Sequence, residues 1–511
     1  MKSNLANLNT VTTNQGGTAH TVNDLELFRR FLFTGSSSNF YEAGTQITKD
    51  VFNNLFKLIN DGHGMPMVNT IHEVTSKGLA PTMEYSLAAL ACIMQKGDIP
   101  TKSYIRSLFN EIVKTGSHLL SLVDYLKMFG SISSSQKKTI CRWYEEKTPD
   151  QLEYQLLKYR NRSGWTHRDV MRQVHFKKES VNDIIRWAVR SDAPSDERKL
   201  IHAFINIQKN QDINNIIKHI NEFEMTWEMI PTAALTDEEV LRALSMKMPM
   251  TASMRYLNRF TIAGLTNDRD WVQMMCNRLT NEHNVQRAKI HPLNAFVSMK
   301  TYADGRGVYG SNTWAPHRDI THAMNTMIDS SFKFVEKTNK KICIGLDVSG
   351  SMQSRISGKP VSSLEAAYLM VKGFLRGEGN QNVDVFGFSN HLLKFDSATI
   401  DHSSYNDLSL INRLPFGGTN PNLLIDYATE KGYHYDAFVF YTDNETGNPV
   451  SVMESLKEYR RRVNPNVKMI IHAFALNHFS LGDGKDRNIL NIAGLDASGP
   501  AITQSFIRGD F

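Results

Sequence analysis

Five oxygen-bearing side chains in the last third of the sequence have the types and spacing of a divalent-metal site. They are Asp347, Ser349, Ser351, Thr419 and Asp443. Carboxylate and hydroxyl oxygens are hard ligands that suit Mg²⁺, with Mn²⁺ or Ca²⁺ as alternatives. Because three of the five are neutral hydroxyls, a bound ion would keep much of its charge and attract an acidic ligand. Asp-x-Ser-x-Ser alone is a common loop sequence, so the prediction depends on the three chain segments together.

The elements expected to position these residues are strands alternating with helices. The apolar run 342–346 ends at Asp347, and the run 437–441 ends just before Thr442-Asp443. Further strands are expected at 383–388 and 467–471, with helices over 363–375, from Pro421 and over 450–463. This alternation predicts a parallel, doubly wound α/β sheet. Ligands bind such sheets at the carboxyl ends of the strands, where both aspartates fall.

The first two-thirds of the chain has helical periodicity. Apolar stripes at 104–113 and 119–129 flank Gly116-Ser117, which predicts a helical hairpin with Ser117 as the N-cap. Thr236-Asp237-Glu238-Glu239 has the pattern of a capping box. Helices in series predict a solenoid-like array. The expected organisation is a flexible leader over 1–20, a helical-repeat domain over 21–340 and an α/β domain over 341–511.

A basic segment lies within the helical part. Residues 158–178 contain seven Lys or Arg against one Asp, with aromatic residues and histidines between them. Lys158 and Arg162 are four residues apart and are expected on one helix face. Cations of this kind contact phosphates, while histidine and aromatic rings stack on unpaired bases. The alternative is a solvated basic helix end with Trp165 in the core.

The charge is unevenly distributed along the chain. Residues 341–511 have 16 basic and 18 acidic residues, whereas the remainder has 42 and 34, a net charge of +8. This excess favours a polyanionic partner for the first part. The four cysteines lack zinc-site spacing, the N-terminus lacks the apolar segment of a secretory signal, and no run approaches ~18 apolar residues. A cytoplasmic protein that does not enter a membrane is expected.

Taken together, these features resemble the Ro autoantigen family, whose members carry a TROVE module followed by a von Willebrand factor A-like domain. The segment from Lys158-Tyr159 to Lys177 is similar to the family signature, and the resemblance runs from about residue 22 to the end. Other landmarks are Ile290-His291-Pro292, Thr442-Asp443-Asn444-Glu445 and the stretch from Gly494 to Phe506. The five oxygen ligands match the metal ion-dependent adhesion site of A domains. Within the family, the chain resembles the bacterial- or phage-type Ro ribonucleoprotein homologues.

The resemblance implies a ring of HEAT-like helical repeats closed onto the A domain, without catalysis. It implies that Y RNAs bind the basic outer surface, while single-stranded 3′ ends of misfolded noncoding RNAs enter a central hole, for RNA stability and quality control. Lys158, Arg162 and His175 match family positions that matter for Y RNA binding. Neighbours proposed by proximity alone are Arg160, Arg168, Arg172 and Lys177. The implied state is a monomer, and an exoribonuclease such as polynucleotide phosphorylase is an implied partner.

Two other functions remain open at this point. One is a protein-interaction module in which the metal binds an acidic protein ligand and the helices act as a scaffold. The other is a nuclease or ATPase, although the sequence has no Gly-x-x-x-x-Gly-Lys phosphate loop and no hydrolase-like His/carboxylate spacing. Hydroxyl-rich ligands favour ligand capture over water activation.

Overall fold

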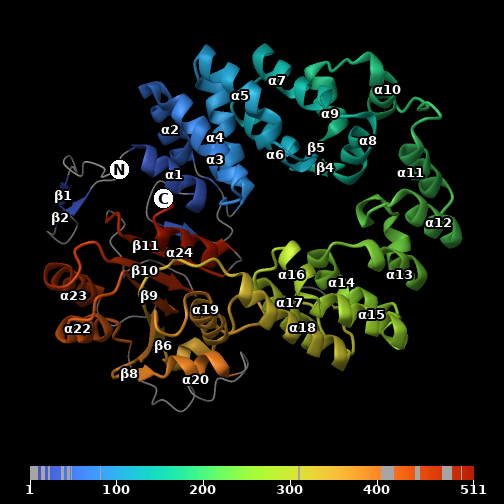
Figure 1. Ribbon diagram of the computed structural model, residues 1–511. Helices are drawn as coiled ribbons and strands as arrows, with labels where there is room; N and C mark the ends of the chain where they lie inside the picture. Colours follow the sequence, from blue (N-terminus) through green and yellow to red (C-terminus); the bar gives the residue numbers. More distant parts are fainter. Residues whose placement is uncertain are drawn as a thin grey trace. The chain divides into compact units, whose positions relative to one another are not determined.

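The structure, a computed structural model, describes residues 10–12, 18–20, 24–35, 40–42, 47, 49–80, 82–308, 311–403, 419–443, 449–474, 486–495 and 498–511. Contacts divide the chain into two units. Unit 1 combines Met1–Gln46 with Asp268–Phe511, and unit 2 is Ile47–Asn267. Figure 1 labels the helices and strands of both.

A seven-stranded sheet forms the centre of unit 1, in the order β3-β11-β10-β9-β6-β7-β8. Its strands are β3 (Phe40–Glu42), β6 (Ile342–Asp347), β7 (Val383–Phe388), β8 (Leu392–Phe395), β9 (Ala437–Thr442), β10 (Lys468–Ala473) and β11 (Ile489–Ala493). All neighbours are parallel except β7 and β8. Every residue of β6 and β9 is buried, which explains their unbroken apolar runs. The predicted doubly wound α/β fold is confirmed, and β3, β8 and β11 are additional strands.

Helices cover both faces of this sheet. Unit 1 contains α1 (Asp24–Thr34), α15 (Arg269–Thr280), α16 (Glu282–Arg287), α17 (Pro292–Ala303), α18 (Arg318–Ser331), α19 (Ser363–Glu378), α20 (Ser397–His402), α22 (Asn422–Lys431), α23 (Pro449–Arg462) and α24 (Ser498–Arg508). One core cluster joins Phe438 and Phe440 of β9 to Leu424 of α22 and Tyr459 of α23. Helix α19, buried along most of its length, packs on β6, β7 and β9. Within the expected leader, β1 (Thr10–Thr12) and β2 (Thr18–His20) pair antiparallel.

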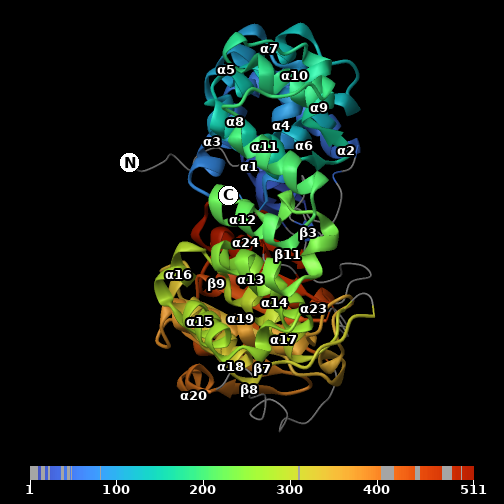
Figure 2. The ribbon, with the colours of Figure 1, turned by 90° about the vertical axis from the view of Figure 1, so that its right-hand side faces the viewer.

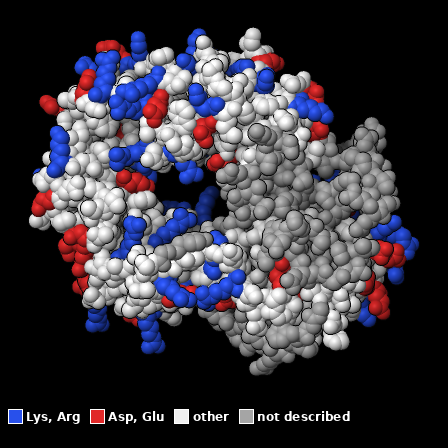
Figure 3. All heavy atoms as spheres, turned by 180° about the vertical axis from the view of Figure 1, so that it is seen from behind, with Lys and Arg blue, Asp and Glu red and all other residues white. Residues whose placement is uncertain are grey.

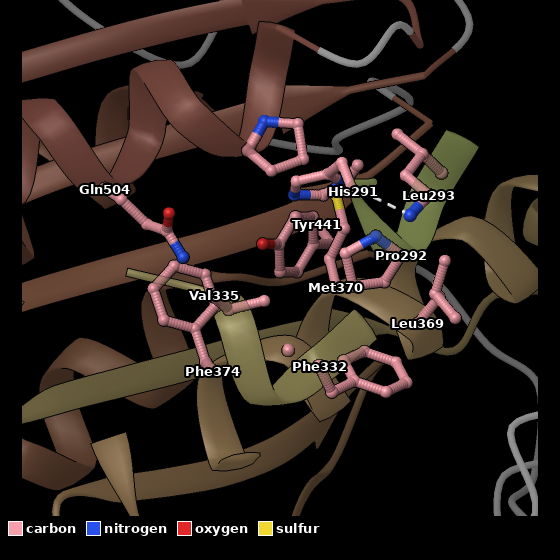
Figure 4. Close-up of a pocket in the computed structure, with 12 residues that line it drawn as sticks. His291, Pro292, Leu293, Phe332, Val335, Leu369, Met370, Phe374, Tyr441 and Gln504 are labelled. Carbon is pink, nitrogen blue, oxygen red and sulfur yellow. Dashed lines mark hydrogen bonds between the residues drawn. The ribbon is translucent and has the colours of Figure 1, made fainter. Parts of the chain in front are cut away.

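His291 and Pro292, one of the sequence landmarks, start α17 at a junction with the sheet domain. Pro292 occupies the first turn of the helix, and His291 Nδ1 accepts a hydrogen bond of 3.1 Å from Leu293 N. Figure 4 shows these residues beside Tyr441 of β9 and Gln504 of α24. The cavity that they line is about 20 Å³, room for one water and too small for an organic ligand. This landmark therefore has a packing role.

Unit 2 is a succession of helices. They are α2 (Lys49–Leu58), α3 (Gly64–Ser76), α4 (Met83–Lys96), α5 (Ile99–Ile112), α6 (Gly116–Met128), α7 (Ser134–Glu145), α8 (Pro149–Lys158), α9 (His167–Val174), α10 (Asn182–Arg190), α11 (Lys199–Lys209), α12 (Ile213–Phe223), α13 (Glu238–Lys247) and α14 (Met250–Ile262). Helix α3 packs on α5, and α4 packs on α6. Figure 2 shows helices α3 to α6 in the upper part of the view. The predicted helical array is confirmed.

Two capping predictions need correction. Helix α6 is capped by Thr115, whose side chain accepts from His118 N, and not by Ser117. Helix α13 is capped by Asp237, which accepts from Val240 N at 3.1 Å, and not by a box starting at Thr236. In both cases the cap lies at the residue where the backbone is still extended. No helix in the described ranges is long and apolar enough to cross a membrane.

Candidate metal site and nucleic-acid surface

Asp347 ends strand β6 and is fully buried with both carboxylate oxygens bonded. Ser349 N donates to Asp347 Oδ1 at 2.9 Å, and Thr442 Oγ1 donates to Oδ2 at 2.8 Å. The Ser349 and Ser351 hydroxyl oxygens lie 3.0 Å apart. The loop after β6 therefore brings a carboxylate and two hydroxyls together, as the alternating spacing predicts.

The other two predicted ligands come from two other segments of the chain. Asp443 is buried and follows β9, which pairs with β6. Thr419 is buried, and the next residue, Asn420, donates from its backbone to Ser389 O at 3.2 Å, just after β7. Residues 417–418, which precede Thr419, and residues 444–445 lie outside the described residues.

The electrostatics of this strand edge suit a cation. Burial and the charge of nearby Asp443 raise the pKa of Asp347 to about 6. Two carboxylates in a buried site repel each other, and a divalent ion would remove this repulsion. Hard oxygens from three segments of the chain are the donor set that Mg²⁺ prefers. The residues present therefore fit a divalent cation.

The basic segment folds as a hairpin between two helices. Helix α8 ends at Lys158, and the strands β4 (Asn161–Arg162) and β5 (Trp165–Thr166) pair antiparallel. The turn between them has positive φ at Ser163 (51°) and Gly164 (78°), a pattern of tight hairpin turns. The prediction that Lys158 and Arg162 share a helix face is wrong, because α8 ends at Lys158 and Arg162 lies in strand β4.

Most predicted RNA-contacting side chains are exposed on or next to this hairpin and helix α9. The exposed ones are Arg160, Arg162, Arg168, Arg172, His175 and Lys177. Lys158 is half-buried and donates from Nζ to Tyr154 OH at 2.8 Å. The Arg160 guanidinium lies 5.1 Å from the centre of the Phe204 ring. The segment thus presents cations to solvent from a fixed backbone.

Aromatic residues behind the hairpin hold it in place. Trp165 is half-buried and donates from Nε1 to Asp124 at 3.3 Å, so it belongs only in part to the core. The buried cluster consists of Trp143, Tyr144, Phe176 and His167, whose Nδ1 lies 2.9 Å from Tyr144 OH. Burial and the charge of Lys147 lower the pKa of His167 to about 4, so this ring is neutral near pH 7.

A groove between α9 and α10 was not predicted from the sequence. It has a volume of about 820 Å³ and is lined by Arg172, His175 and Lys177 on one side. Helix α10 adds Asn182, Arg186 and Arg190, and the two helices pack together. The spacing of four residues along α10 was the available signal, since it places these side chains on one helix face. Figure 3 shows Lys and Arg in small groups over the helical part, with Asp and Glu between them.

These observations define a two-part class of protein: an array of helical hairpins with a basic segment, and an A-type α/β domain with hard oxygens at its strand ends. Family models agree with both parts. The TROVE domain matches residues 81–216 and 219–329, and the Ro60 vWA domain matches residues 341–507. The chain belongs to the Ro/TROVE family.

Similar proteins match along nearly the whole chain. "RNA-binding protein RO60" of Caenorhabditis elegans is 29% identical, covering 98% of this chain and 90% of that protein. The protein of the same name from Deinococcus radiodurans is 27% identical, covering 98% and 96%. The crystal structure of the Deinococcus radiodurans RO (RSR) protein matches with a TM-score of 0.88 at 25% identity, covering 96% of this chain and all of that one.

Proposed function

We propose that this chain is an RNA-binding protein of the Ro type and binds structured noncoding RNA through residues 158–178. The observation that carries the proposal is that five Lys or Arg side chains and His175 are exposed along residues 160–177, on or next to the β4–β5 hairpin and α9. Because the folded backbone already holds these side chains in place, binding several phosphates at once costs less conformational entropy. The names of the relatives and the TROVE match support this function.

The RNA ligands proposed are Y RNAs and misfolded noncoding RNAs. Lys158, Arg162 and His175 contact a Y RNA, with Arg160, Arg168, Arg172 and Lys177 adding phosphate contacts. Arginine can bind phosphate with two hydrogen bonds, whereas lysine acts as a point charge. The same proposal includes a closed helical ring with a central hole through which 3′ ends thread. It also includes roles in RNA stability and quality control in the cytoplasm.

The metal site serves as an accessory site in this proposal. Asp347, Ser349, Ser351, Thr419 and Asp443 hold Mg²⁺, and the ion adds an open coordination position for a carboxylate of an acidic protein ligand. The RNA is bound elsewhere, because its phosphates are matched by cations of unit 2. The protein acts as a monomer and without catalysis, and an exoribonuclease such as polynucleotide phosphorylase would carry out any RNA cleavage.

A gel-shift titration with a Y-type stem-loop RNA tests the RNA site. The variant Lys158→Ala/Arg162→Ala should weaken binding by about tenfold or more, since each lost phosphate contact removes a charge-assisted hydrogen bond. Arg255→Ala is the matched control, because Arg255 is exposed on α14 of the same unit. Equal affinity of the double variant and the wild type would show that the RNA is bound by other residues.

A second experiment separates RNA binding from metal-dependent protein capture. Pull-downs from the native host are compared with and without EDTA, followed by sequencing of the RNA and mass spectrometry of the proteins. RNA capture should survive chelation, whereas capture of an acidic partner should not. Loss of RNA on chelation would place the metal in the RNA site and contradict the proposed separation.

A further inference from the structure

The amino ends of the parallel strands in unit 1 carry a row of cations, which we call the amino edge. Lys341 precedes β6, Lys468 begins β10, and Arg487 lies two residues before β11. The register pairs Ile342 with Ala437 and Ala437 with Lys468, so these strand ends share one edge of the sheet. Figure 1 shows the strands side by side. Neighbouring strands are about 4.8 Å apart, so the cations follow one another at intervals of one or two strands.

Helices that follow the strands add further cations to the amino edge. Lys431 lies in the last turn of α22, Arg461 in that of α23 and Arg508 in that of α24. The Lys468 ammonium donates to Phe506 O near the end of α24, which brings this helix end to the start of β10. A helix dipole stabilises cations in its last turn and accounts for part of this charge. Strand ends and helix ends together make one basic surface.

The cations of the amino edge outnumber the acidic groups that could neutralise them. Lys341 and Lys431 are exposed, and neither they nor Lys468 and Arg487 form an ion pair with any residue that the structure describes. Burial and the charges of neighbouring cations, first among them Lys340, lower the pKa of Lys468 to about 8. Cations that disfavour each other in this way leave a positive potential at the surface.

Arg30 of α1 adds a buried positive charge behind the amino edge. Its side chain is 3% exposed, and Nη2 donates to Arg487 O at 3.1 Å. The Nε and Nη1 atoms have no hydrogen-bond partner among the described residues. A guanidinium in this position is matched by one carbonyl and by no paired carboxylate. It therefore increases the attraction of the edge for an anion in solvent.

This charge is a local feature and not a property of the whole domain. Residues 341–511 contain 16 basic and 18 acidic residues, a net charge of −2. The candidate metal carboxylates, Asp347 and Asp443, end or follow β6 and β9 and so lie at the opposite edge of the sheet. Opposite edges thus carry opposite charges, which orients the approach of a polyanion.

An exposed aromatic ring lies among the cations. Tyr433 follows α22 and is exposed, and its ring centre lies 6.1 Å from that of Tyr427. The Lys431 ammonium is 5.8 Å from the Tyr427 ring, and the Lys341 ammonium is 5.6 Å from the Tyr435 ring. Cations interleaved with rings suit a polynucleotide better than an acidic peptide, because rings contact bases or sugars while cations hold phosphates.

We infer that the amino edge of the A-type sheet is a second RNA-binding surface, on which Lys341, Lys431 and Arg487 contact phosphates. The inference rests on the proposed function for the nature of the polyanion, and it adds unit 1 to the RNA contacts of unit 2. Contacts of this kind hold and orient an RNA without reading its sequence. They also leave the metal site free, because that site lies at the other edge of the sheet.

The test measures how the affinity of the full chain for a full-length Y-type RNA depends on salt. Lys341→Ala/Lys431→Ala removes two exposed cations that form no ion pair with described residues. The slope of log K against the logarithm of the salt concentration should fall in magnitude by about 2, about 1 for each lost phosphate contact. The control Arg287→Ala/Arg318→Ala removes two exposed cations from α16 and α18 of the same unit and should keep the wild-type slope.

Ultraviolet crosslinking of the wild type to the same RNA gives a readout that does not depend on how a variant folds. Peptide mapping should find RNA on peptides that contain residues 431–435 and 487, in addition to residues 158–178. An unchanged slope in Lys341→Ala/Lys431→Ala, an equal decrease in the control, or crosslinks confined to unit 2 would overturn the inference and leave the RNA-binding proposal intact.

Two further outcomes distinguish this inference from its alternatives. If the double variant loses an acidic protein partner and the wild type shows no RNA crosslink at the amino edge, the surface binds protein and the inference is wrong. If the wild type binds no RNA at all, the proposed function fails, and this inference fails with it.

Discussion

Thr442 Oγ1 donates a hydrogen bond of 2.8 Å to Asp347 Oδ2 across the paired strands β9 and β6. The bond links two of the three segments of the candidate metal site through the sheet itself. Asp443 directly follows Thr442 in the chain. The register between β9 and β6 therefore sets the position of the Asp443 carboxylate relative to that of Asp347. The site is therefore positioned by strand pairing, and its loops add the hydroxyls.

Metal binding should stabilise unit 1. Addition of Mg²⁺ or Mn²⁺ to the EDTA-treated protein is expected to raise its melting temperature. At a metal concentration one hundred times the dissociation constant, binding should add about 2.7 kcal/mol to the free energy of unfolding. Asp443→Ala should abolish the shift, because it removes a carboxylate ligand. Glu430→Ala, an exposed acidic residue of α22, is the control. A shift of normal size in Asp443→Ala would rule out the assigned site.

RNA affinity should fall steeply with salt. Between roughly 50 and 200 mM salt, a plot of log K for binding against the logarithm of the salt concentration should be a straight line. Its slope should be negative, with a magnitude of about 0.7–0.9 for each phosphate contact. Arg168→Ala should reduce this slope by about 1, because one exposed cation is lost. Fluorescence anisotropy with a labelled stem-loop RNA measures the slope. An unchanged slope in Arg168→Ala would show that this arginine lies outside the interface.

Acid should destabilise unit 2 through His167. The pKa of this buried ring is lowered to about 4, so the native state binds fewer protons than the unfolded state between about pH 6.5 and 4. Stability is therefore lost as the pH falls through this window, by up to about 3 kcal/mol. Urea unfolding followed by tryptophan fluorescence should show a smaller loss in His167→Gln, which cannot titrate.

The half-buried His202 of the same unit provides the comparison for this test. His202→Gln should lose as much stability on acidification as the wild type does. If His167→Gln also loses as much, other groups are responsible for the acid sensitivity.

Gly116 is expected to be intolerant of a side chain. A Cβ at this position would lie 2.6 Å from His167 Nε2 and 2.9 Å from Tyr159 Cβ. Gly116→Ala should destabilise the protein by about 1–3 kcal/mol through overpacking. Gly373→Ala in α19, where the nearest atom is 3.8 Å away, should instead stabilise it by about 0.4–1 kcal/mol. Chemical denaturation distinguishes the two, and equal effects would contradict the packing argument.

The sequence indicates the central strands well, because strands buried on both faces are apolar without interruption, as in β6 and β9. The short strand β3 and the partly exposed β8 lack such a run, so they appear only in the fold. Four of the five candidate metal ligands could be proposed from the sequence because they end or follow the apolar runs of β6 and β9, whereas Thr419 lies beside no described strand end. The Ser163-Gly164 turn was visible as a turn-forming pair, yet the spacing of Lys158 and Arg162 favoured a helix. The α9–α10 groove depends on packing between helices, which residue spacing alone does not specify.

Strand β3, paired with β11, has a consequence for how the protein is made. Residues 40–42 leave the ribosome more than four hundred residues before their partner, Asn491–Ala493. Unit 2, which is inserted in the chain of unit 1, is complete long before then and can fold first. The sheet acquires its β3 edge only near the end of synthesis. Nascent chains truncated before residue 489 should therefore contain a folded helical unit and an incomplete sheet.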